Sequence, residues 1–151
     1  MCSFWGTEGS NPSPSAIKIL KLLALDYGLK RVGVAVGDTD LKIAMPECVL
    51  ENNAKLKEKI VQMVKSKNVE KVIVGLPLTP SGKEGERAKK VREFVKELKE
   101  LLPHIPVEMH DERYTTQEAL RRLIGVNSKK KKKILDAISA QIILEEYIQS
   151  L

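Results

Sequence analysis

The stretch from Ile19 to Asp38 constrains the fold of this chain more than any other. Its first part, Ile19–Leu25, is almost continuously apolar, as is typical of a central strand covered on both faces. Asp26 stands where this strand should end, and Tyr27–Arg31 read as a turn in which Gly28 can take the positive φ that a tight reversal needs. The pattern predicts a β-hairpin whose first strand ends in a carboxylate.

The second strand of this hairpin has one branched face and one bare face. Valines alternate with small residues, namely Val32, Val34 and Val36 against Gly33, Ala35 and Gly37. A predicted final helix, Ile134–Ile148, contains the small residues Ala137, Ser139 and Ala140. We therefore expect this helix to lie very close to the bare face of the strand.

Three further segments have strand patterns. Leu41–Leu50 alternates but is broken by Pro46, which suits an edge strand, whereas Lys71–Gly75 and Val107–His110 are short strands of the parallel type. We expect an α/β fold with a mixed five-stranded sheet, in which the first three strands are antiparallel and the others parallel, flanked by helices.

Three amphipathic segments between these strands predict helices. The first is capped by Asn52 or Asn53, and two capping boxes, Ser81-x-x-Glu84 and Thr115-x-x-Glu118, start the second and third. Gly75–Gly82, the loop before the second helix, follows the carboxyl end of a parallel strand, where α/β sheets bind ligands.

Length and composition favour one domain in a reducing compartment. We assign residues 17–151 to a single domain and residues 1–16 to a flexible leader, because 151 residues suit one core. The two cysteines are too few for a disulfide framework, and neither a membrane span nor a secretory signal is evident, so we expect a cytoplasmic protein. The formal charge of +6 favours a polyanionic partner.

Three carboxylates far apart in the sequence are expected to meet at one edge of the sheet. Asp26 and Glu112 end parallel strands, and Asp136 lies at the start of the predicted final helix. Crowded carboxylates repel each other unless cations lie between them, and Mg²⁺ or Mn²⁺ prefers such oxygen ligands. Two ions about 4 Å apart would make a phosphodiesterase site.

Each acid also has a simpler interpretation. Asp26 could cap its own turn, Asp111, Glu112 and Arg113 could form a salt-bridged corner, and Asp136 could stabilise the helix dipole. His110 precedes these acids, but we interpret it as a satisfied strand-end histidine and leave it out of the site.

Four ordered motifs, LALDYGLKRVGVAVGD, VIVGLPLTPSGKEG, DERYTT and ILDAISAQIILEEY, resemble those of the YqgF/RuvX family. The resemblance covers Ile19 to Tyr147. It implies an RNase H-like fold and a nuclease that is Holliday-junction-resolvase-like or acts on pre-16S rRNA. It also implies metal-binding, catalytic roles for Asp26, Glu112 and Asp136.

The chain departs from resolvase-like relatives at one strand. They carry a second carboxylate on the strand equivalent to Lys71–Gly75, which here ends in Gly75-Leu76-Pro77. Glu112 would have to substitute for that carboxylate, with Asp111 as its rival.

Several residues are candidates for substrate binding. Arg31 and Arg113 could clamp phosphates, or could pair with Asp111 or Asp38. The loop at Ser81 and Gly82 could hold a phosphate at a helix N-terminus. A run of five lysines, predicted to be a flexible arm that neutralises phosphates rather than a solvated connector, consists of Lys129, Lys130, Lys131, Lys132 and Lys133.

These features predict a metal-dependent endonuclease acting on structured RNA, with the 5′ leader of pre-16S rRNA as the leading substrate. A four-way DNA junction fits the same chemistry. A binding module that has lost catalysis and an ATPase of the actin and Hsp70 type are the other classes, and the chain is too short for the duplicated domain of the latter. The sequence does not indicate an oligomeric state.

Overall fold

The computed structural model describes residues 21–77, 85–112 and 115–151. The leader predicted for residues 1–16 lies outside these described residues, as do Ser81, Gly82 and Arg113. The same holds for the side chains of Glu112, Lys132 and Lys133, whose backbone positions are described.

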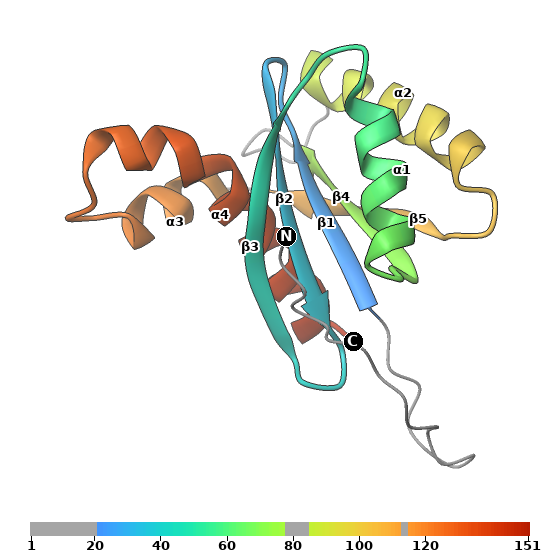
Figure 1. Ribbon diagram of the computed structural model, residues 1–151. Coiled ribbons are helices and arrows are strands. Elements are labelled where there is room, and N and C mark those ends of the chain that lie inside the picture. Colours follow the sequence, from blue (N-terminus) through green and yellow to red (C-terminus); the bar gives the residue numbers. More distant parts are fainter. Residues whose placement is uncertain (1–20, 78–84, 113–114) are drawn as a thin grey trace.

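Five strands form one mixed sheet in the order β3-β2-β1-β4-β5 (Figure 1). Strand β1 pairs antiparallel with β2 and parallel with β4, β2 pairs antiparallel with β3, and β4 pairs parallel with β5. The predicted fold class is therefore confirmed. The strands are β1 (Lys21–Tyr27), β2 (Arg31–Asp38), β3 (Ile43–Glu51), β4 (Lys71–Pro77) and β5 (Val107–Glu112).

The turn between β1 and β2 needs a glycine for a reason that differs from the predicted one. The φ angle of Gly28 lies outside the left-handed region. A Cβ atom at this position would lie 2.5 Å from the carbonyl oxygen of Arg31. Close approach of two backbone segments, rather than a positive φ, excludes a side chain here.

Strand β3 is an edge strand, as Pro46 predicts. Its register with β2 shifts at Glu47, because Val34 pairs with Cys48 and Ala35 with Pro46. The carboxylate of this bulged residue lies 2.9 Å from the Lys67 ammonium, and both side chains are nearly buried. The bulge and this ion pair join the edge of the sheet to the end of the first helix.

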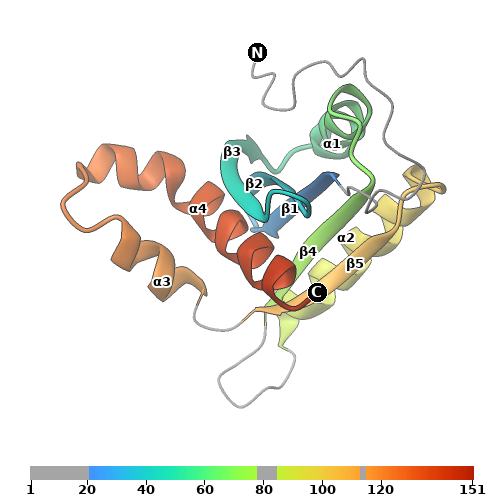
Figure 2. The same cartoon turned by 90° about the horizontal axis from the view of Figure 1, so that it is seen from below.

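Helices cover both faces of the sheet (Figure 2). Apolar side chains of α1 (Leu56–Ser66) and α2 (Glu86–Leu101) form a large core with alternate residues of the strands, such as Leu23 and Val74. The other face, including Ala24 and Ile73, is covered by α4 (Ser128–Gln149), against which α3 (Thr115–Arg122) packs. The α3–α4 hairpin projects beyond the β3 side of the sheet (Figures 1 and 2).

Three helices begin at other residues than the sequence predicts. The N-cap of α1 is Lys55, although the Asn53 side chain accepts a hydrogen bond from the Lys55 amide in the preceding turn. The N-cap of α2 is Gly85, so the prediction that a Ser81 capping box starts this helix is wrong. Helix α4 begins six residues before the predicted Ile134, because the Asn127 side chain caps the Lys129 amide at 2.8 Å.

No helix among the described residues is both long and apolar enough to cross a membrane.

A polar cluster fixes the C-terminal end of α4 to the sheet. The Lys71 ammonium donates to the Tyr147 hydroxyl at 2.7 Å and pairs with the Glu108 carboxylate, and the Tyr147 hydroxyl donates to Glu108 at 3.0 Å. The hydrogen bond from Lys71 is the main cause that lowers the pKa of Glu108, and the hydrogen bond to Glu108 is the main cause that raises the pKa of Lys71. The charged forms of both residues therefore stabilise the fold.

Replacing Glu108 by Gln should lower the free energy of unfolding at neutral pH by about 1 kcal/mol or less, because the half-exposed carboxylate is screened by solvent. A lowered pKa stabilises the fold above the pKa of the unfolded state, and this contribution disappears as the pH falls through the pKa of the folded state. Urea unfolding at several pH values measures the effect. The stability difference from the wild type should disappear in acid, and a constant difference would contradict this account. Glu100→Gln on α2 is the control.

Candidate functional site

Asp26 and Asp136 lie on either side of one glycine. Asp26 of β1 is paired with Gly33 of β2 across the hairpin. A Cβ atom on Gly33 would lie 1.8 Å from the carbonyl oxygen of Asp136, so the backbone of α4 rests directly on this residue. Paired residues of antiparallel strands face the same side of the sheet, so Asp26 faces α4. The structure therefore brings the backbone positions of two of the three predicted acids together.

The small residues on both elements allow this approach, as the sequence predicts. Ala137, Ser139 and Ala140 of α4 are buried, and Ala140 belongs to the same apolar core as Ala35 of β2. Further along the helix, a Cβ atom on Gly37 would lie 2.7 Å from the Leu144 side chain. The bare face of β2 is thus filled by α4 along most of its length.

Asp136 is held by Arg31. The Arg31 Nε atom donates to the Asp136 Oδ2 atom at 3.0 Å, with the Arg31 side chain 53% exposed and that of Asp136 25% exposed. Asp136 lies in the third turn of α4, which has no acidic residue in its first turn, so the alternative interpretation as a first-turn dipole stabiliser is wrong. Asp38, which the sequence offered as a partner for Arg31, accepts hydrogen bonds from the backbone amides of Asp40 and Leu41.

Glu112 ends β5 at the same edge of the sheet as Asp26. Leu25 pairs with Val74, and Val74 pairs with Met109, so His110 of β5 is level with Asp26 of β1. Glu112 therefore lies two strands away from Asp26 and two residues further along the strand direction. These offsets correspond to about 10 Å across the strands and about 7 Å along them.

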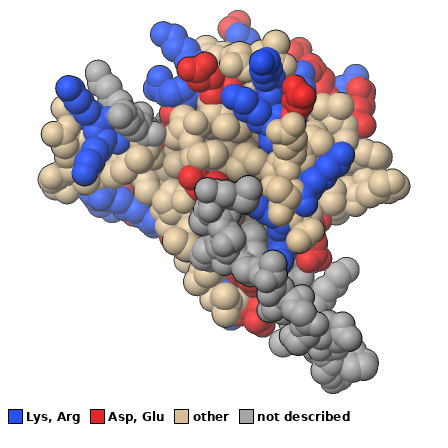
Figure 3. Space-filling model, viewed as in Figure 1, with Lys and Arg blue, Asp and Glu red and all other residues tan. Residues whose placement is uncertain are grey.

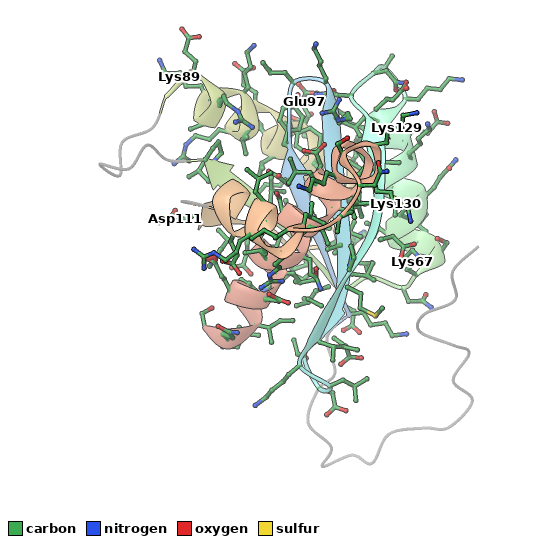
Figure 4. All side chains as sticks on the ribbon, turned by 90° about the vertical axis from the view of Figure 1, so that its left-hand side faces the viewer. Lys67, Lys89, Glu97, Asp111, Lys129 and Lys130 are labelled. Carbon is green, nitrogen blue, oxygen red and sulfur yellow. The ribbon has the colours of Figure 1, made fainter. Side chains whose placement is uncertain are left out.

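Alternation along β5 separates Glu112 from its rival. Position 112 shares the parity of Glu108, which bonds to Tyr147 of α4, whereas position 111 shares the parity of Met109, which packs in the core beneath α1 and α2. Asp111 therefore occupies a strand position on the opposite face from Asp26, and its exposed side chain lies at the end of β5 (Figure 4). The alternation thus places position 112, and not position 111, on the same face of the sheet as Asp26.

A basic pocket adjoins Asp136. It has a volume of about 330 Å³ and is lined by Gly28, Leu29, Lys30, Arg31, Arg87 and Asp136. Lys30 and Arg87 are two residues of this surface that were not predicted from the sequence. The two consecutive basic residues Lys30 and Arg31 after the turn could have indicated a basic surface at this place. Arg87 reaches the pocket from α2, and no local sequence pattern links it to Asp136.

The lysine run begins α4 and is helical, so the prediction of a flexible arm is wrong. Lysine is a good helix former, and the Asn127 side chain caps the helix start, which offsets the unfavourable interaction with the helix dipole. Lys129 and Lys130 are exposed (Figure 4), and basic side chains gather over the α3–α4 hairpin (Figure 3). Arg122 of α3 joins the helices by pairing with Glu145 of α4 at 2.7 Å.

His110 belongs to the cluster at the C-terminal end of α4. Its ring meets the Tyr147 ring edge-on, and its Nε2 atom lies 3.7 Å from a carboxylate oxygen of Glu146. These contacts agree with its interpretation as a satisfied strand-end histidine.

The described side chains include no group of three His, Cys, Asp or Glu residues placed to hold a metal ion. The side chain of Glu112, which would be the third ligand, lies outside this set. Asp26 and Asp136 nevertheless fit a hard divalent cation, because they are two carboxylates on neighbouring backbone positions and one of them already binds a cationic group.

Comparison with known proteins identifies the family. A family model described as "RuvX: Holliday junction resolvase" matches residues 20–150. The chain belongs to this family. A protein of Sulfurihydrogenibium sp. is 41% identical over 87% of this chain and 91% of its own length, and one of Bacteroides fragilis is 39% identical over 86% and 96%. Both are described as "Putative pre-16S rRNA nuclease". The predicted family and its enzyme class, a nuclease, are thereby confirmed.

Solved structures support the fold of this RuvX family member. RuvC of T. thermophilus, in complex with a Holliday junction substrate, has a TM-score of 0.55 at 12% identity and covers 87% of this chain and 94% of its own. The fowlpox virus resolvase, also with Holliday junction DNA, has a TM-score of 0.54 at 11% identity and covers 87% and 98%. The predicted RNase H-like fold is confirmed by these resolvase neighbours.

Gly33→Ala tests whether the contact beneath Asp136 positions the site. The added methyl group would overlap the α4 backbone, so we expect the free energy of unfolding to fall by about 3 kcal/mol, the upper part of the range for overpacked cores. Urea unfolding measures this loss.

Gly85→Ser is the matched control for this substitution, because no atom lies within 4 Å of a Cβ at that position and serine is a good N-cap. We expect the control to be as stable as the wild type. An equal stability of Gly33→Ala would show that α4 does not rest on Gly33.

Proposed function

We propose that this RuvX family member is a metal-dependent endonuclease that hydrolyses phosphodiester bonds of structured nucleic acid, and that its substrate is the 5′ region of pre-16S rRNA. The observation that carries the proposal is the placement of Asp26 and Asp136 around Gly33, beside a pocket lined by three cationic side chains. The names of the relatives supply the choice of RNA.

Asp26 and Asp136 are the proposed ligands of Mg²⁺ or Mn²⁺, and Glu112 is the proposed third ligand. When bound, such a cation supplies Lewis acidity at the phosphate and eases deprotonation of the attacking water. Carboxylates attract the cation, and they need it because their like charges otherwise oppose each other. The Arg31 guanidinium neutralises the Asp136 carboxylate in part.

The cationic side chains around this site are the proposed phosphate contacts. Arg31, Lys30 and Arg87 line the adjoining pocket, where a guanidinium can donate two hydrogen bonds to one phosphate. The lysines of α4 extend the positive surface along the α3–α4 hairpin. Contacts of this kind recognise a nucleic-acid backbone and leave the sequence unread, which suits a substrate recognised by its shape.

A four-way DNA junction is the second candidate substrate. The family description and the two DNA-bound structural neighbours favour it. Catalysis on either substrate would use the same carboxylates, so the substrates must be separated by experiment.

Cleavage assays with labelled pre-16S RNA and with a four-way DNA junction test this proposal. In Mg²⁺ or Mn²⁺ the RNA should be cut, and EDTA should abolish cutting. Asp26→Asn and Asp136→Asn should each reduce the rate by at least about 100-fold, because each removes a charge from the proposed cation site. Metal-dependent cutting of the junction alone would reverse the choice of substrate.

Two variants of β5 complete this test. Glu112→Gln should be as defective as Asp26→Asn, whereas Asp111→Asn, on the opposite face of the strand, should cut at nearly the wild-type rate. Tight binding of RNA without cutting in either metal would contradict the proposal and indicate a binding module. Circular dichroism shows whether each variant is folded.

Replacing Lys129–Lys133 by Gln should weaken RNA binding and flatten its dependence on salt. The plot of log K against log[salt] should lose about 0.7 of slope for each phosphate contact removed. Glutamine preserves helix propensity, so α4 should remain intact.

The matched control replaces five exposed lysines that lie on the other side of the sheet, Lys55, Lys59, Lys65, Lys96 and Lys99. It carries the same change of net charge. Equal slopes for the two variants would show that the lysines of α4 act only through net charge. Fluorescence anisotropy at several salt concentrations measures both slopes.

A further inference from the structure

The ion pair between Arg31 and Asp136 occupies a carboxylate that the proposed metal ion would also need. Arg31 is the first residue of β2 and Asp136 lies in α4, so the pair joins two elements far apart in the sequence. The bond is formed by the Arg31 Nε atom at 3.0 Å. Guanidinium is charged at every accessible pH, so this competitor cannot be removed by deprotonation.

A guanidinium and a divalent cation on one carboxylate repel each other. The repulsion is strongest where solvent screens least, and the Asp136 side chain is only 25% exposed. Arg31 is free to turn away, because its side chain is 53% exposed and it also lines the pocket beside Asp136. Lys30 and Arg87 line the same pocket and add to its attraction for a phosphate.

We propose that Arg31 is an exchangeable counter-ion, which holds Asp136 when no metal is bound and moves to a substrate phosphate when a divalent cation takes the carboxylate. This inference rests on the proposed function and extends it. Arg31 is then a positioning residue in the metal-free protein and a phosphate contact in the complex.

The exchange couples two binding events. A phosphate that draws Arg31 into the pocket leaves Asp136 to the cation, and a cation at Asp136 releases Arg31 to the phosphate. Linkage requires the two effects to be equal, so nucleic acid should tighten metal binding by the factor by which metal tightens nucleic-acid binding.

Arg87 provides the matched control. It lines the same pocket and carries the same guanidinium group, but it comes from α2. The arginine that donates a hydrogen bond to Asp136 is Arg31. Loss of either arginine should weaken phosphate binding. Only loss of Arg31 should remove a competitor from the carboxylate.

The experiment is a titration of Mn²⁺ into the full-length protein without nucleic acid, followed by the electron paramagnetic resonance signal of free Mn²⁺. The wild type, Arg31→Gln and Arg87→Gln are compared, with Asp26→Asn to identify the site. Arg31→Gln should bind Mn²⁺ roughly two- to fivefold more tightly, the range for loss of a partly exposed ion pair. Arg87→Gln should change the dissociation constant by less than about 1.5-fold.

A second titration measures RNA binding by the same proteins in EDTA and in Ca²⁺. The gain in RNA affinity on adding Ca²⁺ should be smaller for Arg31→Gln than for Arg87→Gln, because only the former has lost the exchange.

The outcomes separate this inference from the proposed function. Unchanged or weaker Mn²⁺ binding by Arg31→Gln would overturn the exchange while leaving a metal site in place. Equal tightening in both arginine variants would overturn it too, because that result indicates a general effect of charge. If the wild type takes up no Mn²⁺ that depends on Asp26, the proposed metal site itself fails, and the exchange fails with it.

Discussion

The contact between the α4 backbone at Asp136 and the bare Cα of Gly33 is the constraint on which the rest of this structure depends. A helix can approach a strand this closely only where side chains are missing, and the alternation in β2 removes them from one face alone. The contact fixes where α4 crosses the sheet, and so places Asp136 beside Asp26. Further along α4, the Leu144 side chain packs against Gly37, and the Tyr147 hydroxyl accepts a hydrogen bond from Lys71. These contacts hold the remainder of the helix.

The two faces of the sheet differ in the charged groups that lie beside their apolar cores. The face beneath α1 and α2 is filled by large apolar side chains such as Leu25, Val74 and Phe94. The face beneath α4 is also filled by apolar side chains, such as Ile73 and Ile143. Two polar groups flank this core, the Lys71–Glu108–Tyr147 cluster near the C-terminal end of α4 and the Arg31–Asp136 pair in its third turn. These charged side chains can lie beside the core because each remains partly exposed to solvent.

Local patterns in the sequence were sufficient for the strands, the hairpin and the bare face, because each depends on residues adjacent in the chain. They failed where a distant contact decided the outcome. The lysine run lowers the stability of a helix start, yet these residues are helical behind the Asn127 cap. The partner of Arg31 proved to be Asp136, more than one hundred residues away, instead of Asp38 or Asp111. Arg87 could not be linked to the site without knowing how α2 packs.

The missing acid on β4 has a structural consequence for the proposed site. Val74 of β4 pairs with Leu25 of β1, and the next residue, Gly75, pairs with His110 of β5. Gly75 therefore lies beside Asp26 on the neighbouring strand, and it carries no side chain. Glu112, the proposed third ligand, belongs to β5, which lies two strands away from Asp26. Because β4 adds no carboxylate, phosphate oxygens of the substrate would supply part of the coordination of a cation held by Asp26 and Asp136. Metal and nucleic acid would then bind best together.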